Sequence, residues 1–317
     1  MEHAAAKSPL LNVASPPHWH SGRTVQRTML DFIIALMPAL AMAVYSYGLD
    51  ALSVVSLSVV TAVVTEALCC RAMHREVSVD DYSAVVIGML FAFLLPAQVP
   101  WWIVVMGAAL SVALGKMAFG GLGASPVSAP LVGWAAVQIS WPAVVNVNTS
   151  MLASPLENPL TQLKFFGLHS VDVSFWDMLL GSQLGYLGST QVLPLLLGGI
   201  YLVARGTITI HIPAAFLGGV FLTGLIYRVL DGSVHPNPLF HILAGSTVFG
   251  AFYLATDHSS SPVGSSAMLL YGLLGGVMVV IIRIYGIYPD GVPFAVLLAN
   301  LFAFLLDQIR PKPFGAR

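Results

Sequence analysis

Apolar segments long enough to cross a bilayer recur along this chain, and little polar sequence separates them. A helix that crosses the hydrocarbon core needs about 20 mostly apolar residues. Of the 317 residues, 57% are hydrophobic and only 9% are charged, whereas a typical soluble domain has about 25% charged residues. Because no stretch has the composition of a water-facing domain, we predict an all-α polytopic membrane protein.

Ten apolar segments, several of them short, can be delimited. They cover residues 29–47, 51–70, 83–96, 101–118, 127–145, 192–204, 212–230, 240–256, 267–284 and 292–306. The chain then divides into a polar arm (1–28), a first group of helices (29–145), a connection with a Gly-interrupted piece (146–191), a second group (192–308) and a tail (309–317). Residues 176–190 are too broken to span a bilayer alone, so we predict a re-entrant segment or half-helix there.

Cysteine and histidine are placed poorly for a metal or cluster site. Cys69 and Cys70 are adjacent in an apolar segment, so they form neither a disulfide framework nor a CxxC ligand pair. An iron–sulfur cluster needs about four suitably placed thiolates. His18 and His20 flank Trp19 in the arm, but with no carboxylate or thiolate beside them a surface or docking role is favoured over a metal site. We therefore expect no metal ligands in this chain.

Lys and Arg are distributed unevenly over the loops. If the N-terminus is cytoplasmic, alternation of the ten spans places ten of the 13 Lys and Arg residues on the cytoplasmic side and leaves Lys164, Arg228 and Arg283 outside. Cytoplasmic loops carry an excess of Lys and Arg in membrane proteins. We therefore predict that both termini are cytoplasmic and that the connection 146–174 faces the other side.

One sequence similarity between the two halves suggests an internal duplication. The segment Asp81–Leu95 ends in Phe-Ala-Phe-Leu-Leu, and so does Asp290–Leu306. With five spans in each half, two such repeats would be inverted relative to one another. Inverted repeats place broken helices and binding sites near the middle of the membrane.

Three polar interruptions are candidate cavity linings. They are the Gly-rich turn 116–128, the broken piece 181–190 and the segment 255–262. Irregular backbone at membrane depth is tolerated only where it lines a cavity or is buried in protein, so helix-packing loops are the alternative for each. The chain contains no Ser-His-Asp, HExxH or paired-carboxylate pattern, and adjacent Asp80 and Asp81 suit a solvated helix cap. Self-contained hydrolytic catalysis is therefore not expected.

Two acids lie in or at the end of apolar segments, one in each half of the chain. Glu66 lies within the second segment and Asp257 follows the eighth. A carboxylate inside a membrane is costly enough to suggest a functional position, so we predict that both acids lie near an ion or proton path. Two structural alternatives stay open: an ion pair of Glu66 with Arg71 near the interface, and a turn that Asp257 caps through Ser259.

Several stretches, taken together, resemble one known family. The chain is similar to the D subunit of the Rnf electron-transport complex, which is related to the B subunit of the sodium-pumping NADH:quinone reductase. The similarity covers nearly the whole chain in order, and its most specific part is C-terminal. It is carried by residues 15–22, 29–39, 65–66, 81–84, 116–123, 240–245, 250–257, 261–263 and 288–295.

The resemblance implies a fold and an activity. The fold is about ten transmembrane helices in two inverted five-helix repeats, similar to a urea transporter. The activity is that of a multi-subunit complex in the bacterial inner membrane, which couples electron flow between reduced ferredoxin and NAD to translocation of Na⁺ or H⁺. The implied partners are further membrane, iron–sulfur and flavin subunits and the lipid bilayer, with no nucleic acid. This chain would be one subunit of the complex and not a self-contained enzyme.

The resemblance also implies flavin. Members carry FMN joined by a phosphoester to a hydroxyl residue in a sequence of the type Ser/Thr-Gly-Ala-Thr-Pro-Leu. The counterpart here is Met151–Leu156, in which Met and Leu replace the first two residues. Ser154 is then the acceptor expected for covalent FMN, with Thr149 and Ser150 as alternatives.

A riboflavin is associated with the same family. The resemblance implies that it binds along the Gly-rich turn, where two serines stand at the positions of the family's paired Asn. The residues concerned are Gly120, Gly121, Gly123, Ser125 and Ser128. Two other functions stay open: a solute channel or transporter with the same helical arrangement, and a flavin-free membrane anchor of an electron-transfer complex.

Overall fold

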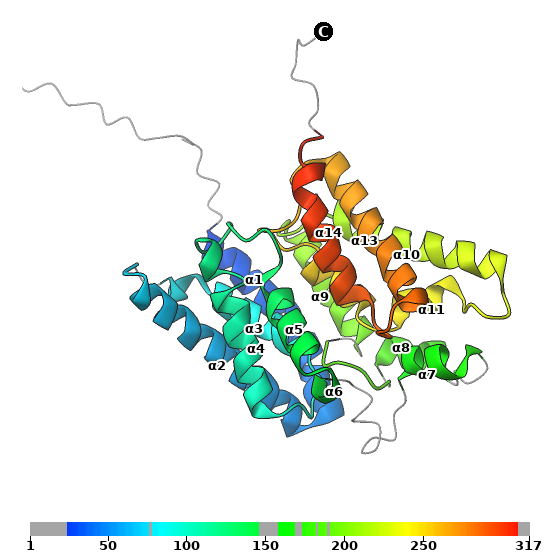
Figure 1. Ribbon diagram of the computed structural model, residues 1–317, viewed down its shortest axis with the longest axis horizontal. Helices are drawn as coiled ribbons and strands as arrows, with labels where there is room; N and C mark the ends of the chain where they lie inside the picture. Colours follow the sequence, from blue (N-terminus) through cyan, green and yellow to red (C-terminus); the bar gives the residue numbers. More distant parts are fainter. Residues whose placement is uncertain are drawn as a thin grey trace, which may run out of the picture.

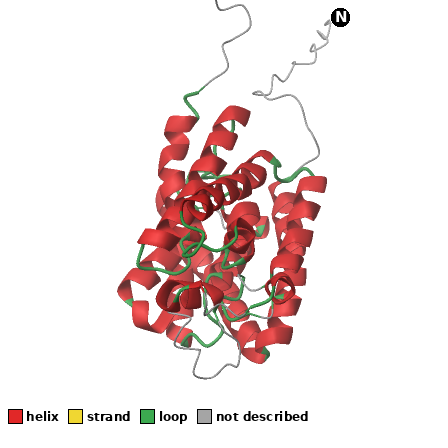
Figure 2. Cartoon of the chain, turned by 90° about the vertical axis from the view of Figure 1, so that its right-hand side faces the viewer, coloured by secondary structure: helices red, strands yellow, loops and turns green. Residues whose placement is uncertain are grey.

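The computed structural model describes residues 24–75, 78–145, 158–168, 173–181, 183–188 and 191–309. Within these ranges all regular secondary structure is helical (Figures 1 and 2). The expected FMN acceptor Ser154 and the alternatives Thr149 and Ser150 lie outside the described residues, as do the first 23 residues and the tail from residue 310.

Five helices in the described part of the chain are long and apolar enough to cross a membrane. They are α1 (Val25–Tyr47), α2 (Leu49–Ala72), α4 (Trp101–Ala113) with its continuation into the short helix η2 (Met117–Phe119), α10 (His211–Leu230) and α13 (Ser265–Tyr285). The chain is thus an all-helical, multi-pass membrane protein, as its composition predicts.

Shorter apolar helices occupy other positions where the sequence predicts spans. They are α3 (Ser83–Phe93), α5 (Ala129–Ser140), α9 (Val192–Ala204) and α14 (Val292–Leu306). Both α5 and α14 have a proline in the first turn, Pro130 and Pro293. A proline is tolerated there because the N–H that it lacks has no partner inside the helix.

Small helical pieces lie between the longer helices. They are η1 (Val79–Asp81) before α3, and α6 (Pro142–Val145), α7 (Pro159–Phe166) and α8 (Phe175–Leu180) between α5 and α9. The Gly-interrupted piece is broken, as predicted: α8 stops at Gly181, whose φ is 87°. Beyond it, Leu187 and Gly188 donate backbone hydrogen bonds to the carbonyls of Leu95 and Phe93. The irregular backbone therefore packs against the end of α3.

The predicted span 240–256 is wrong as a single helix. It consists of α11 (Pro238–Leu243), α12 (Thr247–Phe249) and a π-helical turn, η5 (Gly250–Leu254). The break is at Ala244–Ser246, where Gly245 has a φ of 66°. Gly245-Ser246-Thr247 marks the break in the sequence, but mean hydropathy over the segment does not report it, because the break is stabilised by a side chain from another helix.

That side chain is Arg283, in the last turn of α13. Its guanidinium donates to the carbonyls of His241 (2.6 Å) and Ala244 (2.8 Å), which the break leaves without helical partners. It also donates to the Thr247 hydroxyl at 2.8 Å and to Asp290 at 3.3 Å. Arg283 is only 6% exposed. Arg283, which the sequence places at the outer end of the span 267–284, thus stabilises a broken helix from inside the protein.

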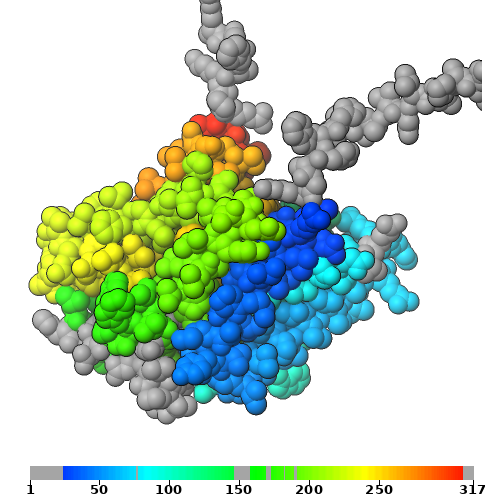
Figure 3. All heavy atoms as spheres, turned by 180° about the vertical axis from the view of Figure 1, so that it is seen from behind, coloured from blue at the N-terminus to red at the C-terminus, as the bar shows by residue number. Residues whose placement is uncertain are grey.

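Close helix packing organises each half. In the second half, α10 lies against α13 at Gly276, where an added Cβ would be 2.2 Å from the carbonyl oxygen of Phe216. In the first half, α2 packs against α3 and α4. The halves meet where α1 lies along α9 (Figure 3) and where Trp134 of α5 contacts Phe294 of α14, with ring centroids 4.8 Å apart.

Large apolar side chains cover much of the outer surface of the long helices. Leu68 on α2 is 62% exposed and Leu222 on α10 is 52% exposed. A contiguous apolar surface of this extent is unusual on a soluble monomer, and it suits contact with lipid. The beginning of α1 and the end of α14 lie on the same side of the molecule (Figure 1).

Candidate functional site

A buried ion pair lies in the first half of the chain. Lys116 Nζ is 2.6 Å from Glu66 Oε1, and the two residues are 2% and 0% exposed. Glu66 comes from α2, and Lys116 follows α4. The alternative in which Glu66 pairs with Arg71 is thus wrong: Glu66 points into the protein and pairs with a cation that follows another helix. Lys116, which lies near the end of the predicted span 101–118, is also buried inside the protein.

Hydroxyl and carboxylate groups complete the surroundings of this pair. Ser78 donates to Glu66 Oε1 at 2.5 Å, and Lys116 also donates to the hydroxyl of Ser83. Asp81 accepts hydrogen bonds from the backbone N–H and hydroxyl of Ser83, and one of its oxygens is 3.8 Å from Lys116 Nζ. Asp81 therefore binds the first backbone N–H of α3, although Tyr82 is the N-cap residue of this helix, and it also belongs to a charged cluster.

The charges of this cluster do not cancel fully. Lys116 faces two carboxylates, Glu66 and the partly exposed Asp81. Glu66 Oε2 is buried and has no hydrogen-bond partner among the described residues. A buried carboxylate oxygen is costly to leave unpaired, so this oxygen is suited to receive a proton or contact a cation.

The Gly-rich turn is tied to the same region. The Arg75 side chain donates to the Gly120 carbonyl at 2.8 Å. Three glycines of the turn have positive φ, Gly120 at 114°, Gly121 at 113° and Gly123 at 86°. Only glycine adopts such backbone angles without strain. The turn therefore folds back sharply between η2 and α5, beside the ion pair.

A small cavity of about 50 Å³ joins this turn to the second half of the chain. Lys116 and Ser83 line it from one side, Gly123 and Ser125 from the turn, and Asp257 from the segment after η5. The structure thus brings together predicted site residues that are far apart in sequence. Gly120 and Gly121 shape the turn without lining the cavity.

Asp257 has the turn-capping contacts that were the structural alternative. One of its oxygens accepts from the Ser259 backbone N–H at 3.4 Å, and the other accepts from the Ser259 hydroxyl at 3.2 Å and the Ser260 hydroxyl at 3.5 Å. The carboxylate nevertheless remains partly exposed at the cavity. Both a structural and an ion-conducting role are compatible with this geometry.

The cavity is too small for a flavin. Sites for small organic ligands usually have about 300–1,000 Å³, and this cavity of about 50 Å³ has room for water or an ion. Ser128 is fully buried, and its hydroxyl has no partner among the described residues. One hydroxyl without a partner is not enough to bind a flavin, so the residues of this turn do not fit riboflavin. No reaction step is assigned to a riboflavin at this turn.

The ion pair between Glu66 and Lys116 was not predicted from the sequence. The sequence placed Lys116 at the end of the span 101–118 and at the start of the Gly-rich turn, but it assigned no partner to this lysine. A buried acid in a membrane protein is usually paired, so a lysine in apolar sequence was the available signal for a partner. The spacing of the two residues did not indicate that they pair, because 50 positions separate Lys116 from Glu66 in the sequence.

This chain is similar to known proteins over nearly its full length. The model of the NQR2, RnfD, RnfE family matches residues 12–315. The chain is 37% identical over 306 residues to the D subunit of the Na⁺-translocating ferredoxin:NAD⁺ oxidoreductase complex of Acetobacterium woodii, covering 94% of this chain and 93% of that protein. It is 31% identical over 330 residues to the D subunit of the proton-translocating ferredoxin:NAD⁺ oxidoreductase complex of Clostridium ljungdahlii, covering 100% of both. The D subunit of the ion-translocating oxidoreductase complex of Alcanivorax borkumensis is 32% identical over 331 residues, covering 96% of this chain and 97% of that protein.

Proposed function

Since this chain belongs to the NQR2, RnfD, RnfE family, we propose that it is the D subunit of an ion-translocating ferredoxin:NAD⁺ oxidoreductase complex. The observation that carries the proposal is the near full-length similarity, at 31–37% identity, to proteins of that name. This similarity favours the redox-driven complex over a solute channel or a flavin-free anchor. The other membrane, iron–sulfur and flavin subunits of such a complex are its partners.

The test uses membranes from cells that lack this chain. Ferredoxin-dependent reduction of NAD⁺ and the accompanying ion uptake should both be lost and should return with the full-length chain. Because one relative is named for Na⁺ and another for protons, uptake of both ions is measured. Full coupled activity without the chain contradicts the proposal.

Within this function, the Glu66–Lys116 pair is a coupling element. Taking two charges out of water costs several kcal/mol per ion, and an apolar pair in their place would avoid that cost. A buried carboxylate with one unpaired oxygen can instead exchange a proton or hold a cation as the charge of its neighbour changes. The cavity that Lys116 and Asp257 both line connects the ion pair to the segment after η5.

The fold of this protein is ten spans in two inverted repeats, similar to a urea transporter. In support, each half has a buried cation near the end of a long helix that donates to a hydroxyl at the start of a shorter one. Lys116, after α4, donates to Ser83, and Arg283, in the last turn of α13, donates to Thr247. In Figure 1, α4 runs towards the side on which α1 begins, whereas α13 runs away from it. Opposite directions are expected of inverted repeats.

The protein lies in the bacterial inner membrane with both termini in the cytoplasm. The excess of Lys and Arg on that side supports this orientation, and so does the location of the start of α1 and the end of α14 on one side. Reporter fusions at Arg317 and Gly167 should report opposite sides of the membrane. Reporters on the same side contradict the ten-span arrangement.

Covalent FMN on Ser154 completes the proposal. Its support is the family resemblance of Met151–Leu156 and the expected position of this segment outside the cytoplasm. Bound FMN would supply one- and two-electron redox chemistry, and the role of this chain is to present a serine hydroxyl for the phosphoester bond.

A further inference from the structure

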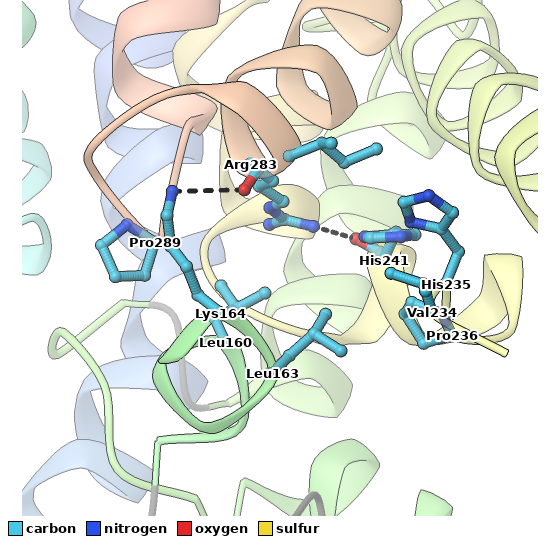
Figure 4. Close-up of a pocket in the computed structure, with 10 residues that line it drawn as sticks. Leu160, Leu163, Lys164, Val234, His235, Pro236, His241, Arg283 and Pro289 are labelled. Carbon is cyan, nitrogen blue, oxygen red and sulfur yellow. Dashed lines mark hydrogen bonds between the residues drawn. The ribbon is translucent and has the colours of Figure 1, made fainter. Parts of the chain in front are cut away.

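We propose that a second pocket, lined by Lys164, Arg283 and His241, binds a phosphate group. It is a cavity of about 170 Å³ between α7, α11, the end of α13 and the segment after α10. Figure 4 shows the Arg283 guanidinium between Lys164 and His241, and His235 beside His241. This pocket is separate from the Glu66–Lys116 site.

The charge balance of the pocket favours an anion. Arg283 is paired with Asp290 at 3.3 Å. Lys164 donates to the backbone carbonyls of Arg283, Gly286 and Tyr288, and no ion pair is found for it among the described residues. One positive charge therefore remains at the pocket without a counter-ion there. Partial burial lowers the pKa of Lys164, so an anion at this position would stabilise its charged form.

Unused hydrogen-bonding groups indicate what the ligand must offer. His241 is 1% exposed, and neither of its ring nitrogens has a hydrogen-bond partner in the described structure. The same holds for Nε of Arg283. A buried donor without a partner costs about 1–3 kcal/mol. Because Arg283 Nε can only donate, the missing partner must present an acceptor oxygen.

A phosphate group meets both conditions. It carries negative charge and several acceptor oxygens that can accept from Arg283 Nε and from a ring N–H of His241, and hydrogen bonds to an ionised acceptor are among the strongest in proteins. The cavity of about 170 Å³ is about ten times the volume that one water needs. An apolar ligand would leave the nitrogens unpaired, and a metal cation would be repelled by Lys164 and Arg283.

The rim of the pocket suits two sources of phosphate. Val234 in its lining is 56% exposed, and Leu230 and Tyr285 nearby along the chain are 74% and 72% exposed. These side chains stand at the ends of α10 and α13, where the acyl chains of a phospholipid could lie. Inorganic phosphate from the aqueous phase has the same chemistry without the chains.

The experiment measures thermal unfolding of the full-length chain in a neutral maltoside detergent. Three additions are compared: inorganic phosphate, short-chain phosphatidylglycerol, and the diacylglycerol with the same chains but no phosphate. We expect phosphatidylglycerol to raise the unfolding midpoint and diacylglycerol not to do so. A rise with inorganic phosphate as well assigns an aqueous source, and a rise with the lipid alone assigns a headgroup.

Two variants and one control test the residues. His241→Leu should weaken binding by about tenfold, the loss expected for one charge-assisted hydrogen bond. Lys164→Gln should weaken it by about as much, because it removes the positive charge beside the pocket. His211→Leu is the matched control, because His211 also has an unpartnered ring nitrogen but lies at the opposite end of α10. Size-exclusion profiles and helix content check that each variant is folded. Because Lys164 is only half-buried, Lys164→Gln tests the pocket if His241→Leu does not fold. The proposal is overturned if neither phosphate compound shifts the midpoint, if diacylglycerol shifts it equally, or if a folded variant binds as wild type does.

Discussion

Lys116 and Glu66, which are 50 positions apart in sequence, form a 2.6 Å ion pair that is almost wholly shielded from solvent. The pair connects α2 to the turn after α4 and places a polar group beside a cavity that reaches Asp257. The pair therefore links the two helices, and it is also the contact that we propose as a coupling element for ion movement.

The first prediction concerns the stability of this pair. Lys116→Met should destabilise the chain by about 3–5 kcal/mol, because it leaves the carboxylate of Glu66 buried without a counter-ion. The double variant Glu66→Leu/Lys116→Met should recover most of that loss, since it removes both charges. Thermal unfolding in detergent measures both. Equal destabilisation by the single and double variants would show that the charges are not coupled.

The second prediction concerns the contact of α10 with α13. Gly276→Ala should destabilise the protein by about 1–3 kcal/mol, as overpacking does, because the new methyl would be 2.2 Å from the Phe216 carbonyl. Gly218→Ala is the matched control on α10, since a Cβ there has no neighbour within 4 Å. It should leave the unfolding midpoint unchanged or slightly higher. Similar midpoints for the two variants would contradict the packing.

The third prediction separates the two roles of Asp257. Asp257→Asn keeps the size and one acceptor oxygen for the Ser259 contacts but removes the charge, so assembly should be normal and ion uptake per electron should fall. Asp307→Asn is the control, because Asp307 accepts a hydrogen bond from the Val263 N–H at 2.9 Å and does not line the cavity. Normal coupling in both variants would leave Asp257 as a turn cap.

The fourth prediction concerns covalent flavin. Ser154→Ala should abolish flavin fluorescence of the denatured chain in a gel, because the phosphoester needs the hydroxyl oxygen. Thr149→Ala and Ser150→Ala should keep the signal. An intact mass without an FMN increment in the wild-type chain, or an unchanged signal in Ser154→Ala, would contradict the assignment.

The sequence predicts some parts of this fold well for a physical reason. The bilayer demands long apolar segments, and α1, α2, α10 and α13 all stand close to the predicted bounds. The predicted helix at 240–256 failed because hydropathy does not report hydrogen bonding. The guanidinium of Arg283 satisfies the carbonyls at the break, and that contact is visible only in three dimensions.

The sequence predicted which acids belong to the candidate site but not which residue pairs with Glu66. Glu66 and Asp257 were recognised because acids are costly in apolar sequence, and the glycines of the turn 116–128 marked a sharp bend. The partner of Glu66 could not be deduced from spacing, since Arg71 is closer in sequence than Lys116. Helix packing makes Lys116 and not Arg71 the partner of Glu66, because α2 lies against α4 and the lysine side chain is directed inward.

The most direct test of a coupling role for the Glu66–Lys116 pair is the number of ions taken up per electron in vesicles that contain the assembled complex with Glu66→Gln. This variant keeps the shape and the acceptor oxygen for Ser78 but removes the charge that faces Lys116. Assembly is checked by co-purification of the other subunits, and electron flow by ferredoxin-dependent NAD⁺ reduction. We expect ion uptake per electron to fall while the complex still assembles. Wild-type electron transfer together with a wild-type ratio of ions to electrons would contradict the coupling role and leave the Glu66–Lys116 pair a purely structural contact.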